Sequence, residues 1–410
     1  MRRSCKKNLS LMFIVLVTLA FSISTASAEP NTYNITFSAD YSGPYTYLMK
    51  SADPAQKIFL KYWNETAGQK LGIKIVKKSY DTRYNPAVVA SLWPGILAGD
   101  KPILHLGLGG PDVASLMKRI PQDKVPLFMS TGTYGYCWLP NQWMFQPRPT
   151  YAHEFRGFMT WVLNNWKEER PVRIGAFSTQ GIPAYEDQIK GVKSFCADDP
   201  KLEFVGVEWI KLVPVSISSE LKRLAKKKPD YIYMGTNVHQ VVSLIRAQKQ
   251  LGVHIPLVMA THTDLIVTAK ALPWTELEGH YDVGACTSPL DKQTEAYKIF
   301  EKYRPEVAPD APWDLNAVQF AGQIVLALRA VERTANKVGA GKITGEAIYN
   351  AMYDGPFSEK ELLGLWPTLE FKKDSPFSSV NMKVKSSTVR NGKHVLTAEE
   401  WLTIPPIKKY

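Results

Sequence analysis

The sequence predicts an α/β protein of two lobes, each with a parallel sheet covered by helices on both faces. Short apolar segments typical of strands alternate along most of the chain with longer segments of helical periodicity. Several of these strands end in polar or glycine-rich turns. A chain of 410 residues is also long enough to divide its core between two lobes.

The N-terminus has the three parts of a secretory signal peptide. Four basic residues precede an apolar segment at 9–23, and Ala26-Ser27-Ala28 follows as a small-residue cleavage site. Because a membrane-spanning helix needs about 20 apolar residues, an uncleaved anchor is the weaker alternative. We expect a signal peptide at 1–28, cleavage near Ala28 and a soluble mature protein in the periplasm.

Charge and cysteine content narrow the class of protein further. The formal net charge of +12 includes four basic residues of the leader, which leaves +8 for the mature chain, scattered except for runs at 226–228 and 408–409. Solvated helix ends explain such runs more simply than a nucleic-acid site, so we expect no nucleic-acid partner. The mature cysteines, Cys137, Cys196 and Cys286, form neither a disulfide framework nor a zinc motif, and we expect mostly buried, unreactive thiols.

The first series of strands and helices follows the leader. Its predicted strands are 34–39, 72–80, 102–106 and 126–129, and its clearest helix is 86–97. The turn after the first strand ends at Tyr45. The third strand ends in the glycine-rich turn Gly107-Leu108-Gly109-Gly110, and the fourth in Ser130-Thr131-Gly132-Thr133.

The second series begins with a long predicted helix at 151–167. Its predicted strands are 172–177, 204–210, 230–236 and 255–260, separated by helices at 185–195, 219–226 and 238–251. The stretch 229–264 is the clearest βαβ unit, and its strand tips carry Asn237, His262 and Thr263. Open parallel sheets bind ligands beyond the carboxyl ends of their strands, so these tips predict a binding crevice.

The last hundred residues depart from simple alternation. Residues 315–331 are apolar almost all round, which predicts a buried helix. Thr344 is a plausible N-cap for a helix at 348–352. Residues 369–371, 382–389 and 394–396, the last two flanking Asn391-Gly392, predict a C-terminal β-hairpin tail.

Six short segments occur in a characteristic order: Ser42-Gly43-Pro44, Tyr80-Asp81, 107–110, 126–133, Arg148-Pro149-Thr150 and 229–235. With these segments the chain resembles the type I periplasmic binding proteins, specifically the branched-chain amino-acid (leucine/isoleucine/valine-type) substrate-binding components of ABC transporters. The resemblance covers nearly all of the mature chain. It implies two Rossmann-like lobes, three hinge crossovers, ligand capture between the lobes and a membrane permease as partner. We expect a monomer with lobe 1 at 29–148 and 287–355 and lobe 2 at 149–286 and 356–410.

The resemblance also implies which residues bind the ligand. On the first lobe these are Tyr45, Gly107, Leu108, Gly109, Thr131, Gly132 and Thr133, and on the second Tyr185, Asn237, His262 and Thr263. Backbone N–H groups of the glycine-rich turn and of helix N-termini suit a carboxylate, because the helix dipole favours negative charge there. The threonine hydroxyls can add further hydrogen bonds.

Two departures from the family pattern bear on the ligand. In the amino-acid binders an acidic residue at the position of His262 takes the ligand's ammonium group, and a serine-rich turn stands where this chain has Leu108-Gly109-Gly110. A neutral imidazole is a poor partner for a cation. We therefore expect a neutral solute or a carboxylate with an aromatic or apolar part. A histidine that titrates near neutrality would hold an anion less well as the pH rises.

Some alternatives stay open at this point. The ligand can still be a branched-chain amino acid, or the protein can serve as a ligand sensor for a separate receptor. Aromatic residues beyond the fourth strand either contact the ligand or brace the hinge: Tyr134, Tyr136, Trp138, Trp143 and Phe145.

Catalytic motifs give little support to an enzyme. The turn at 107–110 lacks the third glycine of a dinucleotide fingerprint, and 339–344 imitates a phosphate loop with Ile343 in place of the hydroxyl. No His-Glu-x-x-His or Gly-x-Ser-x-Gly motif occurs in the sequence, and the seven histidines lack paired ligand spacing. We expect a binding protein without enzymatic activity, cofactor or metal, and a secreted enzyme is the remaining alternative.

Overall fold

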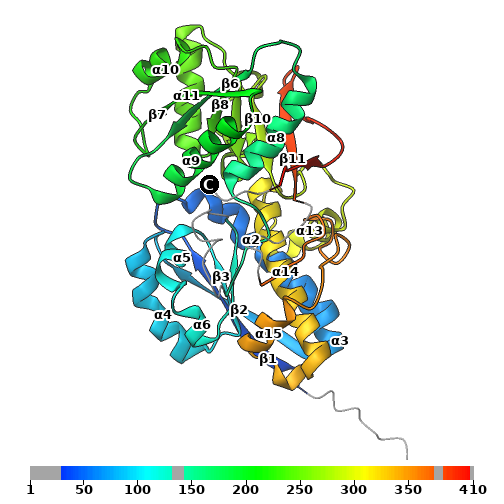
Figure 1. Ribbon diagram of the computed structural model, residues 1–410. Helices are drawn as coiled ribbons and strands as arrows, with labels where there is room; N and C mark the ends of the chain where they lie inside the picture. The colour runs from blue at the N-terminus through cyan, green and yellow to red at the C-terminus, as the bar shows by residue number, and fades with distance from the viewer. Residues whose placement is uncertain (1–28, 132–142, 374–381, 407–410) are drawn as a thin grey trace, which may run out of the picture.

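The computed structural model describes residues 29–131, 143–373 and 382–406. They form two lobes, each built on one sheet, which lie one above the other in Figure 1. The predicted signal peptide, Cys137, Gly132, Thr133, Tyr134, Tyr136 and Trp138 lie outside the described residues.

The first lobe is built on a parallel sheet with the strand order β2-β1-β3-β4-β5. The strands are β1 (Asn31–Ala39), β2 (Ile73–Asp81), β3 (Leu104–Gly107), β4 (Leu127–Met129) and β5 (Met144–Phe145). The helices that accompany this sheet are α2 (Thr46–Trp63), η1 (Asn64–Gly68), α3 (Gln69–Leu71), α4 (Pro86–Asp100), α5 (Gly110–Leu116), α6 (Ile120–Asp123), α13 (Glu295–Val307), α14 (Leu315–Val338), η4 (Ala340–Lys342) and α15 (Gly345–Ala351).

The second lobe is built on a sheet with the order β12-β11-β10-β9-β8-β6-β7, and β13 pairs with β11. The strands are β6 (Val172–Ser178), β7 (Leu202–Trp209), β8 (Tyr231–Met234), β9 (Leu257–Ala260), β10 (Tyr281–Gly284), β11 (Lys383–Arg390), β12 (Lys393–Leu396) and β13 (Leu402–Thr403). The helices are α8 (Tyr151–Asn165), α9 (Pro183–Asp198), α10 (Ser218–Ala225), α11 (Val238–Leu251), η2 (Thr261–Thr263), α12 (Leu265–Thr268) and η3 (Trp274–Glu276). Strands β6 to β10 are parallel, and the hairpin β11–β12 adds to them in the antiparallel sense.

Several predicted ends of elements are confirmed by their local chemistry. The hydroxyl of Thr344 accepts a hydrogen bond from the Ala347 N–H at 3.1 Å and so caps α15. Gly252 ends α11 with a φ of 62°, a left-handed conformation that costs glycine little. The predicted hairpin turn is also present, with both Asn391 and Gly392 at positive φ, as a two-residue type I′ turn requires.

Other parts of the fold differ from the sequence prediction. The predicted strand at 369–371 is reduced to one isolated bridge between Leu369 and Phe357. Strand β10 was not predicted, because Asp282 interrupts the apolar pattern of this short strand. Asp282 is nevertheless buried, because it accepts hydrogen bonds from the Ser387 N–H and hydroxyl on the neighbouring strand.

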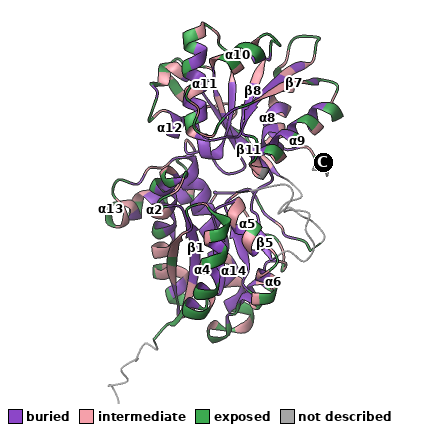
Figure 2. Ribbon diagram, turned by 90° about the vertical axis from the view of Figure 1, so that its left-hand side faces the viewer, coloured by how far each residue is buried: buried purple, intermediate pink, exposed green. Residues whose placement is uncertain are grey.

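Helix α14 is the buried element that joins the core to the region between the lobes, and Figure 2 shows it among the buried parts of the molecule. It packs along α2, and Gly322 lets the indole of Trp366 approach closely, since an added Cβ would lie 2.0 Å from its nitrogen. Within this apolar helix, Gln323 donates to the carbonyls of Gly107 and Phe128, both at 2.8 Å. The helix is therefore fixed to the tips of β3 and β4.

The chain passes between the two sheets three times, after β5, after β10 and before β11. The predicted α/β architecture of two lobes with parallel sheets is thus confirmed. The exact lobe boundaries stay a prediction. Within the region assigned to lobe 2, Phe371 packs on Phe145 of β5 at a ring distance of 5.4 Å, and Trp366 lies on α14.

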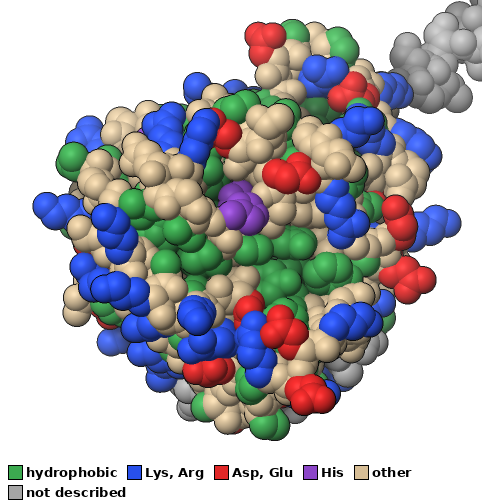
Figure 3. Space-filling view, turned by 90° about the horizontal axis from the view of Figure 1, so that it is seen from above, with side chains coloured by type: hydrophobic (Ala, Val, Ile, Leu, Met, Phe, Trp, Pro, Cys, Tyr) green, Lys and Arg blue, Asp and Glu red, His purple; other side chains and the backbone are tan. Residues whose placement is uncertain are grey.

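Cys196 and Cys286 are free and buried, and burial raises the pKa of the Cys196 thiol to about 12, as expected for unreactive thiols. No helix within the described ranges is long and apolar enough to cross a membrane. The same ranges contain no group of three or more His, Cys, Asp or Glu side chains placed to hold a metal ion. On the face seen from above in Figure 3, Lys and Arg side chains are spread round the edge, and acidic side chains lie between several of them.

Candidate functional site

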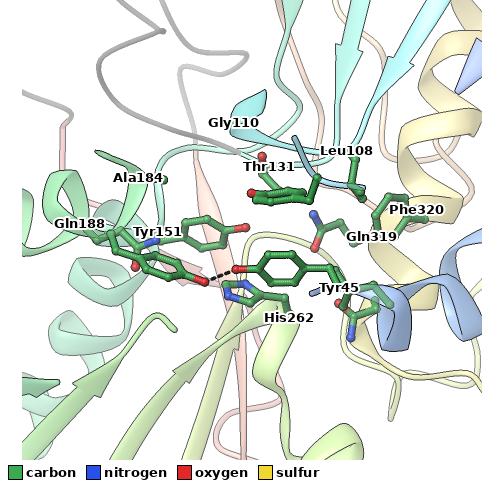
Figure 4. A pocket seen from close by; sticks show the side chains of 14 residues that line it. Tyr45, Leu108, Gly110, Thr131, Tyr151, Ala184, Gln188, His262, Gln319 and Phe320 are labelled. Atoms are coloured by element: carbon green, nitrogen blue, oxygen red, sulfur yellow. Dashed lines mark hydrogen bonds between the residues drawn. The ribbon is translucent and has the colours of Figure 1, made fainter. Parts of the chain in front are cut away.

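A cavity of about 40 Å³ lies between the two lobes. It exceeds the roughly 10–15 Å³ that one water molecule requires. Its lining comes from both lobes and from α14 (Figure 4): Tyr45, Leu48, Tyr84, Leu108, Gly110, Thr131, Tyr151, Ala184, Tyr185, Gln188, His262, Asn316, Gln319 and Phe320. These residues lie near the carboxyl ends of the strands of both sheets, where open α/β sheets bind ligands.

Four of the lining residues are tyrosines. Tyr45 and Tyr84 belong to the first lobe, with ring centroids 4.5 Å apart, and Tyr151 and Tyr185 belong to the second. The hydroxyls of Tyr45 and Tyr185 are hydrogen bonded to one another across the lobes (Figure 4). Burial raises the pKa of Tyr151 to about 12 and the pKa values of the other three well above 10. All four phenols are therefore neutral at physiological pH.

His262 lies in η2 at the tip of β9, beside the tyrosines. Its ring is 5.2 Å from the ring of Tyr151 in an edge-on arrangement. Burial, helped by the nearby charge of Arg148, lowers the pKa of His262 to about 4. The expectation of a histidine that titrates near neutrality is therefore wrong, because the closed lobes remove the imidazole from water. Its Nδ1 atom is buried and has no hydrogen-bond partner.

A buried ion pair, Arg148 and Glu154, lies behind the cavity wall next to Tyr151. The Arg148 Nε atom donates to Glu154 at 2.7 Å, and Nη2 donates to the hydroxyl of Thr261 at 2.7 Å. The guanidinium lies 4.6 Å from the ring centroid of Tyr151. Both members of the pair are fully buried. Arg148 thus supports Tyr151 and the tip of β9, while Glu154 offsets its charge.

Three carboxamide side chains complete the polar lining. Gln188 comes from α9, and Asn316 and Gln319 lie one turn apart on α14. Each keeps at least one buried amide atom without a hydrogen-bond partner: Nε2 of Gln188, Oε1 of Gln319 and both atoms of Asn316. Because buried polar groups are nearly always satisfied by protein, water or ligand, these amide atoms are available to a polar molecule in the cavity.

Of the site residues predicted from the sequence, five line the cavity: Tyr45, Leu108, Thr131, Tyr185 and His262. Four others lie away from its lining: Gly107, Gly109, Asn237 and Thr263. Gly132 and Thr133 lie outside the described residues.

The four residues outside the lining have partners within their own lobes, and the Gly107 carbonyl accepts from the Nε2 atom of Gln323 at 2.8 Å. The backbone N–H groups of Leu108 and Gly109 both donate to the carboxylate of Asp112 at 2.9 Å, so they are not free for an anion. The side chain of Asn237 caps α11, and the hydroxyl of Thr263 donates to the Ala260 carbonyl.

Several lining residues were missed by the sequence reasoning. Asn316 and Gln319 lie with Gln323 at positions i, i+3 and i+7 of a helix that the sequence marks as apolar. This polar stripe was the available signal, since polar residues on a buried face need partners. Two of the aromatic residues considered for the site do brace the first lobe instead: Trp143 stacks on Tyr349 at 4.1 Å, and Phe145 packs among other rings.

The chain is similar to known proteins in sequence pattern and in fold. A family model described as "Periplasmic binding protein" matches residues 32–374. An ABC transporter substrate-binding protein from Aeropyrum pernix superposes with a TM-score of 0.79 at 17% identity, covering 92% of this chain and 96% of that one. No curated protein sequence matches the chain significantly.

Two further solved structures are similar. One is a branched-chain amino-acid ABC transporter protein from Thermus thermophilus with bound valine, with a TM-score of 0.78, 14% identity, and coverage of 90% of this chain and 96% of that one. The other is a fatty-acid ABC transporter substrate-binding protein from Thermomonospora curvata, with a TM-score of 0.75, 20% identity, and coverage of 91% and 92%. At these identities the likeness establishes the fold.

Proposed function

Because the chain belongs to the periplasmic binding protein family, with the type I fold of ABC transporter substrate-binding proteins, we propose that it is the solute-binding component of an ABC importer. In this role the mature protein works in the periplasm. It captures a small organic ligand between its lobes and delivers it to a membrane permease.

The observation that carries this proposal is the cavity lined from both lobes. A ligand that contacts Tyr45 on one side and Tyr185 on the other favours the closed arrangement over an open one, since only the closed arrangement offers both contacts. Ligand binding and lobe closure are then one equilibrium. A permease that distinguishes closed from open lobes can recognise the loaded protein.

The character of the lining supports a solute without an ammonium group. The described lining contains no Asp, Glu, Lys or Arg, its phenols are neutral and its histidine is uncharged. A cation moved from water into this cavity would find no carboxylate, and an unpaired buried charge is costly. The tyrosine rings and Phe320 suit a flat or apolar body. We assign a neutral solute or a carboxylate with an aromatic or apolar part as the ligand class.

The competing ligand is a branched-chain amino acid, such as the valine bound by the Thermus thermophilus protein. The free carbonyl oxygens of Asn316 and Gln319 could accept from an ammonium group. Neutral oxygens supply a weaker partner than the carboxylate that such a group normally receives.

A panel of solutes tests the proposal on the mature chain, residues 29–410. Leucine, valine, benzoate, phenylacetate, benzamide and phenylacetamide are compared by thermal unfolding and small-angle scattering. A solute at about 100 times its dissociation constant should stabilise the protein by about 2.7 kcal/mol and reduce the radius of gyration. Stabilisation by leucine or valine alone would assign the amino-acid class. A panel widened to general solutes that changes neither quantity would contradict solute capture.

A further inference from the structure

We propose that the cavity selects an uncharged head group that both donates and accepts hydrogen bonds, of the carboxamide kind, and that it discriminates against the matching carboxylate. This inference rests on the proposed solute capture and narrows its ligand class. It follows from the orientation of the side-chain amides that enter the cavity from opposite sides of the tyrosines (Figure 4).

The first lobe and α14 present a fixed hydrogen-bond acceptor. The Nε2 atom of Gln319 donates to the backbone carbonyl of Ser130, which can only accept. Reversing the amide would place two oxygens against each other, so the orientation of Gln319 is determined. Its Oε1 atom is the one that remains buried without a partner. A ligand with an N–H or O–H group can satisfy this oxygen, and an ionised carboxylate has neither.

The second lobe presents a hydrogen-bond donor, the side-chain amide nitrogen of Gln188. The Oε1 atom of Gln188 accepts from the hydroxyl of Tyr233 at 2.9 Å, and its Nε2 atom is buried without a partner. A ligand carbonyl can accept from this nitrogen. Asn316 adds one further donor and one further acceptor, since neither of its amide atoms has a partner.

A carboxamide head group matches this arrangement because it carries both functions without charge. Its N–H₂ can donate to Gln319, and its C=O can accept from one of the unpartnered amide N–H groups of the lining, those of Asn316 and Gln188. A carboxylate would leave the Gln319 oxygen unpaired and would bring negative charge towards it. Leaving one buried partner unsatisfied typically lowers affinity by roughly 10- to 100-fold.

Calorimetry with matched pairs tests the inference on the mature wild-type chain at pH 7.5, where the acids are ionised. The pairs are benzamide and benzoate, phenylacetamide and phenylacetate, and isobutyramide and isobutyrate. We expect the amide of each pair that binds to bind at least 10-fold more tightly than the acid. A carboxylate that binds as tightly as its amide, or more tightly, would overturn the inference while leaving solute capture intact.

A variant pair locates the preference. Gln319→Met keeps the shape of the side chain but removes the acceptor, so the amide preference should fall to about 3-fold or less. Gln122→Met changes an exposed residue of α6 and should leave the preference unaltered. An undiminished preference in folded Gln319→Met would overturn the role of Gln319. If neither these pairs nor any other solute closes the lobes, the proposed function fails and the inference with it.

Discussion

Acid should destabilise the closed protein in part through His262. The imidazole is buried between the lobes, and its pKa is lowered from 6.5 to about 4, chiefly by loss of hydration. Between these two values the unfolded chain binds a proton that the folded chain does not. Stability therefore rises with pH across this window, is complete above about pH 6.5 and is lost as the pH falls towards 4.

The size of the effect follows from the same two values. Proton linkage with a folded pKa of about 4 and an unfolded pKa of 6.5 gives roughly 2–3 kcal/mol between pH 7.5 and pH 4.5. His153 and His280, whose pKa values burial lowers to about 3, should add to the acid sensitivity of the protein. A comparison of the wild type with His262→Gln removes these shared contributions.

Urea unfolding at four pH values from 4.5 to 7.5 measures this contribution. The wild type should lose roughly 2–3 kcal/mol more of its free energy of unfolding than His262→Gln does over that range. Equal losses in the two proteins would show that His262 is not a buried neutral group. The binding of a solute that closes the lobes should weaken in the same acidic window. This is the opposite of the trend expected for an anion held by a protonated histidine.

Three other substitutions test the packing around the cavity. Arg148→Met leaves the buried carboxylate of Glu154 without its partner and should lower the free energy of unfolding, measured by urea titration, by about 3–5 kcal/mol. Adding Glu154→Leu to this variant should recover much of that loss. Gly322→Ala forces a methyl group against the indole of Trp366 and should lower the free energy of unfolding by about 1–3 kcal/mol in the same assay. The control Gly95→Ala places its methyl group in open space on a helix and should be neutral or stabilising. Tyr185→Phe removes the hydroxyl contact between the lobes, so calorimetry should show affinity for benzamide reduced by roughly 10-fold with the fold retained.

The sequence predicted the fold well because its signals are local. Alternating apolar segments, the cap at Thr344 and the turn at Asn391-Gly392 each depend on neighbouring residues only. The strand β10 was missed because Asp282 breaks its apolar pattern, and that carboxylate is satisfied by Ser387, about a hundred residues later. Such a compensation is visible only after the chain has folded.

The candidate site was predicted less completely, for a related reason. Strand tips give positions such as Thr131 and His262, but Asn316 and Gln319 enter the cavity from a helix near the end of the chain. The glycine-rich turn was predicted to bind an anion, but two of its N–H groups donate hydrogen bonds to the side chain of Asp112 instead. Contacts between residues distant in sequence decide which polar groups remain free in the cavity. Those free groups in turn decide which ligands can be bound.

The central prediction is that a solute binds between the lobes, in contact with Tyr45 and Tyr185. A crystal structure of the mature chain with benzamide, or with whichever carboxamide proves tightest, tests this directly. We predict the solute in the cavity, in contact with Tyr45 and Tyr185, with its amide nitrogen about 2.7–3.2 Å from the Oε1 atom of Gln319. Density for the solute on an outer surface, with the cleft unchanged, would contradict it.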